Sequence, residues 1–347
     1  MSRRNFFGAV VQLVAIIGLW LGLGVTPPCL GQGAGNGAKG LARAIEVQER
    51  HTDKIFAKGG VVGTAVGLDT QGRHVVKVYV ATAQDAVGIA RQLEDVPVDV
   101  QVTGYVFALK GKPGPAVDPT ARFVRPVPIG VSTGHPAITA GTIGCRVTDG
   151  SEVYALSNNH VYANENRASV TDAVIQPGTF DGGESPVDDI GFLFDWETIR
   201  FDGSDNLIDA AIALSSTDVL GNSTPSNGYG VPLATTIAAT PGMKVMKYGR
   251  TTSLTKGAID GINATVNVGY DRGVARFVNQ IIVTPGTFSA GGDSGSLIVA
   301  NDAGRKGVEG PNHRKPVGLL FAGSQVITIA NPIDVVLASF GVTVDGD

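Results

Sequence analysis

Cysteine is almost absent from this sequence: the 347 residues include only Cys29 and Cys145. We expect residues 1–31 to be removed on export, which would leave Cys145 as the single cysteine of the mature chain. No intrachain disulfide could then form, and this excludes a small secreted domain stapled by disulfides. Cys145 lies in the apolar stretch 143–147 and is interpreted as a small buried core residue, not as a nucleophile.

Basic runs are absent as well, since 27 lysines and arginines are scattered among 31 acidic residues, for a formal net charge of −4. A nucleic-acid-binding protein carries a basic patch, so we expect no nucleic-acid partner. No histidine, cysteine and acidic residues have the spacing of a zinc site, and we expect neither a metal nor another cofactor. The chemistry is then expected to come from side chains alone.

Aromatic residues are also few, at 6% of the sequence, whereas glycine is abundant with 48 residues. Glycine-rich turns separate many short segments of valine, isoleucine, threonine and alanine, a pattern that favours a mainly β fold. After the first 119 residues we expect two antiparallel β-barrels, in residues 120–230 and 231–347.

The N-terminal end predicts export. Arg3 and Arg4 precede a nearly unbroken apolar run to Val25 and then small residues, which is the pattern of an export signal over residues 1–31. We therefore expect an exported protein, either periplasmic or secreted. The apolar run is long enough to span a bilayer, so the alternative is an uncleaved membrane anchor through residues 6–25, and contact with a membrane is expected only in that case.

A small α+β module is predicted between the signal and the barrels. It would occupy residues 41–109, between a glycine-rich flexible tether at 32–40 and a linker at 110–119 rich in glycine and proline. The module shows no assembled set of catalytic residues. Its predicted elements are a helix over 41–56, strands over 61–68 and 74–81, a short helix over 85–94 and a strand over 98–108.

A serine between glycines suggests a nucleophile. In the stretch Gly291-Gly292-Asp293-Ser294-Gly295-Ser296 the small residues leave room for a substrate, and glycine allows backbone angles that aim consecutive N–H groups into one space. Ser294 is the candidate nucleophile, and the N–H groups of Gly292 and Ser294 would form the oxyanion hole. The alternative is a glycine-rich hairpin whose serine only caps the turn.

Two further side chains are placed to activate a serine. The strand that begins at Val153 ends at His160, flanked by small and polar residues, as a general base at a barrel rim would be. Asp209 lies within the apolar run 207–214, where a carboxylate is costly to bury without a partner such as an imidazole N–H. The alternative histidines and acids are His135, His313, Asp188, Asp189 and Asp205.

The order His160, Asp209, Ser294 resembles that of the chymotrypsin-like (trypsin-fold) serine peptidases, over about residues 120–347. The segment Gly249-Arg250-Thr251-Thr252 is similar to one in the bacterial α-lytic protease and streptogrisin group. Together with the N-terminal module, the sequence is similar to a bacterial set related to the plant Nal1-type trypsin-like proteins. The resemblance implies a serine endopeptidase that acts on a protein or peptide through an acyl-enzyme. The alternative is a catalytically silent binding or scaffold protein with the same fold.

The same resemblance implies the residues that support the site. Arg250 would pair with Asp293 and hold the oxyanion turn, because the acid before the nucleophile is buried in this family. Val161 stands where many relatives have a cysteine, so the usual disulfide beside the histidine is missing. The primary substrate pocket would lack an acid and would accept a small or apolar side chain. Its residues would be Phe288 at the base and Phe321, Ala322 and Gly323 in the wall.

Overall fold

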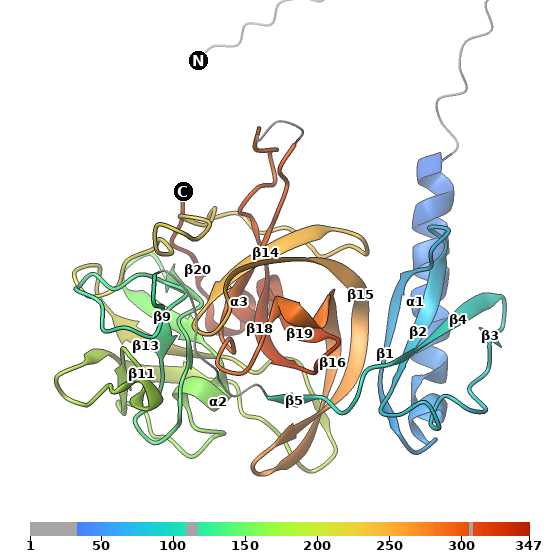
Figure 1. Cartoon of the computed structure of the whole chain (residues 1–347), viewed down its shortest axis with the longest axis horizontal. Coiled ribbons are helices and arrows are strands. Elements are labelled where there is room, and N and C mark those ends of the chain that lie inside the picture. The colour runs from blue at the N-terminus through green and yellow to red at the C-terminus, as the bar shows by residue number, and fades with distance from the viewer. Residues whose placement is uncertain (1–32, 109–116, 305–307) are drawn as a thin grey trace, which may run out of the picture.

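The computed structural model describes residues 33–108, 117–304 and 308–347, and these residues form a mainly β protein (Figure 1). The predicted export signal lies outside the described residues. In the part of the chain that is described, no helix is both long and apolar enough to cross a membrane. The elements fall into an N-terminal unit and two β halves.

The N-terminal unit packs helix α1 against a small sheet. Ala44 and Val47 of α1 are fully buried against the strands. Its elements are α1 (Gly33–Phe56), β1 (Val61–Leu68), β2 (His74–Val80), β3 (Gln92–Leu93), β4 (Val96–Val102) and β5 (Phe107–Ala108).

Three predictions for this unit were wrong, and one of them is the strand expected over 98–108, which is divided into β4 and β5 with no strand over 103–106. Helix α1 begins at Gly33, so the stretch expected to be a flexible tether is helical. The short helix expected over 85–94 does not form. The carboxylate of Asp85 accepts hydrogen bonds from the Thr82 N–H and hydroxyl, which closes a turn. Gly88 follows with a φ of +78°, a left-handed conformation that interrupts a helix.

The first β half is built on an antiparallel sheet with the order β10-β11-β13-β9-β8-β20. Three consecutive residues of β9, Tyr154, Ala155 and Leu156, lie in the core of this half. Within the described residues, the end strands β10 and β20 do not pair with each other. The elements are β6 (Ser132–Thr133), β7 (Gly141–Thr142), β8 (Cys145–Thr148), β9 (Val153–Ser157), α2 (Asn159–Tyr162), β10 (Ala173–Ile175), the 3-10 helix η1 (Thr179–Asp181), β11 (Asp189–Trp196), β12 (Asp205–Asn206), β13 (Ala211–Ser215) and β20 (Thr343–Val344).

The second half is a ring of antiparallel pairings. Strands β14, β15, β16, β19, β18 and β17 pair in that order, and β17 pairs again with β14. The elements are β14 (Lys244–Gly249), β15 (Ser253–Tyr270), β16 (Gly273–Thr284), the 3-10 helix η2 (Gly286–Phe288), β17 (Leu297–Ala300), β18 (Pro316–Gly323), β19 (Thr328–Pro332) and α3 (Ile333–Phe340).

The N-terminal unit joins this ring through its main chain. Strand β1 pairs antiparallel with β15, with Gly63 opposite Val266, so one sheet runs from the unit into the second half (Figure 1). The buried Lys77 of β2 donates to Asp260 of β15 at 2.7 Å, which adds an ion pair to the pairing. Farther along the chain, β5 lies between two strands of the second half, with Phe107 opposite both Gly323 of β18 and Gly269 of β15.

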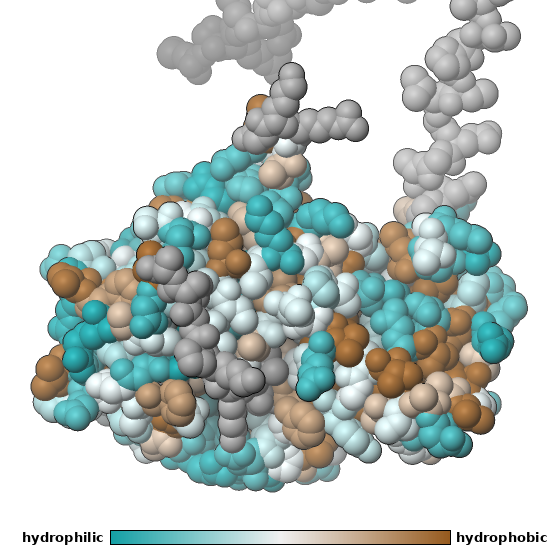
Figure 2. Space-filling view, viewed as in Figure 1, coloured by the Kyte–Doolittle hydropathy of each residue, from teal (hydrophilic) through white to brown (hydrophobic). Residues whose placement is uncertain are grey.

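A shared hydrophobic core joins the two β halves. It includes Leu156 of the first half and Leu297 and Leu319 of the second. Cys145 is fully buried in this core, and burial raises the pKa of its thiol. On the face shown in Figure 2, hydrophobic residues lie in small separate groups among hydrophilic ones. The predicted site residues His160 and Asp209 lie in the first half and Ser294 in the second, so the site is sought where the two halves meet.

Candidate functional site

His160 and Asp209 form a tightly paired unit. Strand β9 leads into the short helix α2, which carries His160, and the chain just before β13 carries Asp209. The Nδ1 atom of His160 lies 2.6 Å from Oδ2 of Asp209, and the His160 backbone N–H donates to Oδ1 at 3.2 Å. Asp209 is fully buried. The carboxylate of Asp209, although it lies in an apolar run, is thus satisfied by the imidazole and the backbone N–H of His160.

Tyr270, the last residue of β15, belongs to the same unit. Its hydroxyl donates to Oδ2 of Asp209 at 2.8 Å, and its ring meets the imidazole of His160 edge-on, with 5.9 Å between ring centroids. Burial, followed by the charge of Asp209, raises the pKa of Tyr270 well above its usual value. The phenol is therefore a protonated donor at neutral pH. No sequence signal pointed to this residue, which lies beside a hairpin turn, 61 positions after Asp209.

The turn that carries Ser294 is shaped by two glycines. Gly292 and Gly295 have φ values of +92° and +94°. A Cβ at Gly292 would lie 2.6 Å from Oγ1 of Thr251, and one at Gly295 would lie 2.2 Å from Oγ of Ser157, so larger residues would displace the turn. The N–H groups of Gly292 and Ser294 have no hydrogen-bond acceptor within the described chain. These groups can thus act as donors to a bound oxyanion.

Ser294 and His160 do not hydrogen-bond to each other in this structure. The Ser294 hydroxyl donates to the carbonyl oxygen of Phe321 in β18 at 3.3 Å. Nε2 of His160 is buried and has no partner among the described residues. A hydrogen bond between nucleophile and base is often formed only once a substrate is bound.

Asp293 is neutralised by Lys247, and the predicted Arg250–Asp293 pair was wrong. Nζ of Lys247, on β14, lies 3.3 Å from Oδ2 of Asp293, and neither side chain is exposed. The Asp293 carboxylate also accepts the N–H groups of Thr251 and Ala290, both at 2.9 Å. Lys247 reaches Asp293 because its side chain points inward from the strand.

Arg250 instead binds an acid of the first half. Its Nε donates to Oδ2 of Asp181 at 2.8 Å, its Nη2 donates to Oδ1 of the same carboxylate, and Ser132 donates to Asp181 as well. The two oxygens of Asp181 match the planar fork of a guanidinium, which explains why Arg250 turns away from Asp293. Arg250 lies close to the turn of Ser294, since a Cβ placed at Gly292 would be only 3.0 Å from its Cδ.

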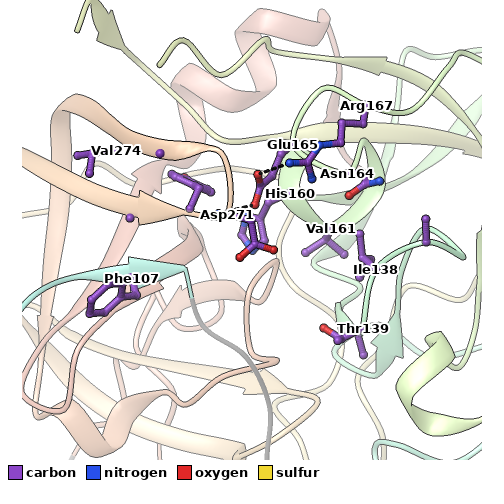
Figure 3. Close-up of a pocket in the computed structure, with 15 residues that line it drawn as sticks. Phe107, Ile138, Thr139, His160, Val161, Asn164, Glu165, Arg167, Asp271 and Val274 are labelled. Atoms are coloured by element: carbon purple, nitrogen blue, oxygen red, sulfur yellow. Dashed lines mark hydrogen bonds and ion pairs between the residues drawn. The ribbon is translucent and has the colours of Figure 1, made fainter. Parts of the chain in front are cut away.

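Two cavities lie along the site. The first, of about 850 Å³, is lined by His160, by Glu165 and Arg167 from the loop after α2, and by Asp271 and Val274 from the hairpin opposite (Figure 3). The second, of about 810 Å³, is walled by mostly small residues of the second half and by residues of the N-terminal unit, namely Val102, Thr103, Gly104, Tyr105 and Phe107. Phe107 lines both cavities.

The predicted pocket residues lie at different depths. Gly323 lines the second cavity. Phe288, Phe321 and Ala322 are fully buried in the core behind the cavity. The residues that sequence reasoning missed on this wall are small and give no chemical signal; they are Gly286, Ser289, Ala290 and Gly291.

Four of the five alternative histidines and acids have other partners, whereas Oδ1 of Asp189 is buried without a hydrogen-bond partner among the described residues. His135 lies 3.2 Å from Asp172, and His313 lies 3.4 Å from Glu309. Asp188 accepts Arg122, and Asp205 pairs with Arg276. Within residues 33–108, 117–304 and 308–347, no group of histidines, cysteines and acids could hold a metal ion.

The chain is similar to a family and to several solved structures. The family model described as the Nal1 C-terminal domain matches residues 198–329, less than half of the chain, which include Asp209 and Ser294 but not His160. A glutamic acid-specific serine protease, which uses a histidine triad in substrate binding, is 21% identical, with a TM-score of 0.44 over 63% of this chain and 100% of its own. Protease A of Thermobifida fusca is 20% identical, with a TM-score of 0.43 over 64% of this chain and 99% of its own. A Nocardiopsis protease is 16% identical, with a TM-score of 0.43 over 63% and 98%. No curated protein matches the chain.

Proposed function

We propose that this protein is a serine endopeptidase of the chymotrypsin-like type, with His160 as general base, Asp209 as its orienting acid and Ser294 as nucleophile. The observation that carries the proposal is the 2.6 Å contact between His160 Nδ1 and the fully buried Asp209. This contact fixes the imidazole tautomer and leaves Nε2 as the proton acceptor. The buried carboxylate of Asp209 meets both Nδ1 and the backbone N–H of His160, as the acid that orients a general base would.

The proposed reaction is acyl transfer. The Ser294 hydroxyl turns from the Phe321 carbonyl toward Nε2 of His160, gives up its proton there and attacks the substrate carbonyl carbon. The N–H groups of Gly292 and Ser294 bind the oxyanion. The imidazolium then protonates the leaving amine, and water, activated by His160, hydrolyses the acyl-enzyme. No metal or other cofactor is required in this scheme.

The second candidate is a catalytically silent binding or scaffold protein. One observation favours it: Ser294 is almost fully buried and its hydroxyl is held by Phe321 instead of by His160. An activated serine reacts covalently with a fluorophosphonate, whereas an idle serine does not. We expect the wild-type chain to be labelled at Ser294, and Ser294→Ala and His160→Ala to remain unlabelled. Absence of labelling in folded wild-type protein would favour the silent scaffold.

The wider setting is part of the proposal. The resemblance of the motifs to the bacterial α-lytic protease group and to Nal1-type proteins, together with the strand ring of the second half, supports a two-barrel fold with an added N-terminal module. The expected export signal supports a periplasmic or secreted enzyme, or one anchored through residues 6–25. The substrate would be a protein or peptide, with no nucleic acid involved.

A further inference from the structure

We infer that Tyr270 is a positioning residue of the catalytic set, and that Glu165 holds it in place through the tip of the β15–β16 hairpin. This inference rests on the proposed function, because it assigns a role in orienting Asp209 and His160. Tyr270 comes from the second half, whereas Asp209 and His160 belong to the first half. The hairpin therefore adds a hydrogen-bond donor to the His160–Asp209 pair from across the interface between the two halves.

The first support is the number of donors around Asp209. Oδ1 accepts the His160 backbone N–H, and Oδ2 accepts both His160 Nδ1 at 2.6 Å and the Tyr270 hydroxyl at 2.8 Å. A hydrogen bond to a buried charged group contributes more than one between neutral groups. Since Tyr270 and the imidazole share one oxygen, the phenol fixes the direction from which His160 binds it. It also withdraws part of the negative charge that the imidazolium would otherwise meet.

The second support is the way the hairpin delivers Tyr270. Strand β15 extends to Tyr270, which pairs with Gly273 of β16 around the turn Asp271–Arg272. The ring of Tyr270 packs edge-on against Phe201, at 5.8 Å between centroids, and next to Phe277 at 6.2 Å. These contacts hold the ring plane independently of the hydroxyl. Removing only the hydroxyl should therefore leave the packing intact.

The third support is Glu165, which caps the hairpin tip. Its buried carboxylate accepts the backbone N–H groups of Asp271 and Arg272, each at 3.2 Å, and its carbonyl oxygen accepts the Arg272 guanidinium at 2.8 Å. Figure 3 shows Glu165 and Asp271 facing each other beside His160. The two halves of the molecule are thus fastened within one turn of Tyr270.

The loop that presents Glu165 is strained. Asn164, Glu165 and Asn166 have φ values of +47°, +53° and +67°, and non-glycine residues in this left-handed region carry a conformational cost. Asn159, next to His160, offsets this cost through two hydrogen bonds to Asn166. Its amide nitrogen donates to the side-chain oxygen of Asn166, and its amide oxygen accepts the backbone N–H of Asn166. The strained loop is hydrogen-bonded to Asn159, the neighbour of His160, and to the hairpin that carries Tyr270. Both residues that donate to Asp209, His160 and Tyr270, therefore lie next to segments that this loop holds.

The test compares Tyr270→Phe with the matched control Tyr154→Phe in the full chain. Tyr154 donates its hydroxyl to Asp149 at 2.9 Å, outside the site. We expect Tyr270→Phe to lower kcat on the order of 10- to 100-fold with little change in KM, the loss expected for one hydrogen bond to a charged group. The acid limb of the kcat/KM profile should move to higher pH, because Asp209 would then attract the imidazolium more strongly. Tyr154→Phe should match the wild type.

A second variant and a second readout keep the outcomes separate. Glu165→Gln retains one acceptor for the hairpin N–H groups and should show a smaller loss of kcat, even if Tyr270→Phe fails to fold. Proton NMR of the low-field His160 Nδ1–H signal reports the pairing with Asp209 without any need for turnover. We expect the signal to move in Tyr270→Phe and not in Tyr154→Phe. An unmoved signal would overturn the inference, as would an unchanged kcat and pH profile. If the fluorophosphonate did not label the wild-type protein while the His160 Nδ1–H signal still moved in Tyr270→Phe, the peptidase proposal alone would be overturned.

Discussion

Lys247 and Asp293 form an ion pair next to Ser294, the proposed nucleophile, with 3.3 Å between Nζ and Oδ2 and no exposed surface on either side chain. Asp293 precedes Ser294 in the chain, so its carboxylate anchors the turn that presents both the hydroxyl and the oxyanion donors. Lys247 also donates to the carbonyl oxygen of Ser253 at 3.1 Å. The pair is therefore part of a buried hydrogen-bonded network next to the turn of Ser294.

Removing Lys247 should damage stability and activity together. In Lys247→Met the buried Asp293 loses its cation, and breaking one side of a buried pair costs about 3–5 kcal/mol. We expect a loss near the lower end, because Asp293 keeps its backbone donors. Denaturant unfolding and peptide hydrolysis measure the two effects. Lys244→Met, an exposed lysine of the same strand, is the matched control.

The double variant Lys247→Met with Asp293→Asn separates charge from packing. It removes both charges, so it should recover part of the stability that either single variant loses. If Lys247→Met were as stable and as active as Lys244→Met, the ion pair would have no role in holding the turn.

The free energy of unfolding should increase with pH in the alkaline range because of Lys247. Burial lowers the pKa of Lys247 below its usual value of 10.5, and the charge of Asp293 opposes this shift only in part. Between the lowered folded pKa and 10.5 the unfolded chain binds a proton that the folded chain does not, so stability rises with pH across this window. Lys247→Met should lack this increment. Parallel stability curves for the two proteins over the window would contradict the expectation.

Substrates should carry a small or apolar residue before the scissile bond. Among the described residues that line the second cavity there is no acid to bind lysine or arginine. A peptide library gives the profile directly, and dominance of basic residues at that position would refute the prediction. Gln325→Glu places one carboxylate on the cavity wall with little change in shape, and it should increase cleavage after basic residues.

The N-terminal unit should remain with the mature protein. The pairing of β1 with β15 and the ion pair between Lys77 and Asp260 join it to the second half, and its loss would expose the edge of β15. Mass spectrometry of the exported chain should find residues 41–109 still present. A mature chain that begins near residue 120 would instead mark the unit as a removed pro-region.

Features carried by local sequence could be predicted. The glycines around Ser294 reveal a special turn because only their backbone angles permit it, and the apolar run around Asp209 reveals a buried charge that needs a partner. The strand that leads to His160 and the apolar run around Asp209 predicted the pairing of these two residues, which the structure shows. The mainly β fold followed in the same way from the many short β-branched segments between turns.

Features set by contacts between distant segments could not be predicted. Arg250 was matched to Asp293 by resemblance, but Asp181 in the first half offers the guanidinium a bidentate partner. Lys247 lies in an ordinary strand, and only the inward direction of its side chain makes it the partner of Asp293. Tyr270 reaches Asp209 because β15 is 18 residues long, a length that only its tertiary pairing with β1, β14 and β16 explains.

Strand β5 places a segment of the chain itself on the edge of β18 that runs beside Ser294. Phe107 and Ala108 pair there with Gly323 and Ala322, one residue from the carbonyl that holds Ser294. An extended peptide that adds to this edge must displace a covalently attached competitor, whose effective concentration through a short linker is on the order of millimolar. At micromolar peptide the edge would be open only while β5 is released. The apparent KM would therefore measure the release of β5 as well as the affinity for the peptide.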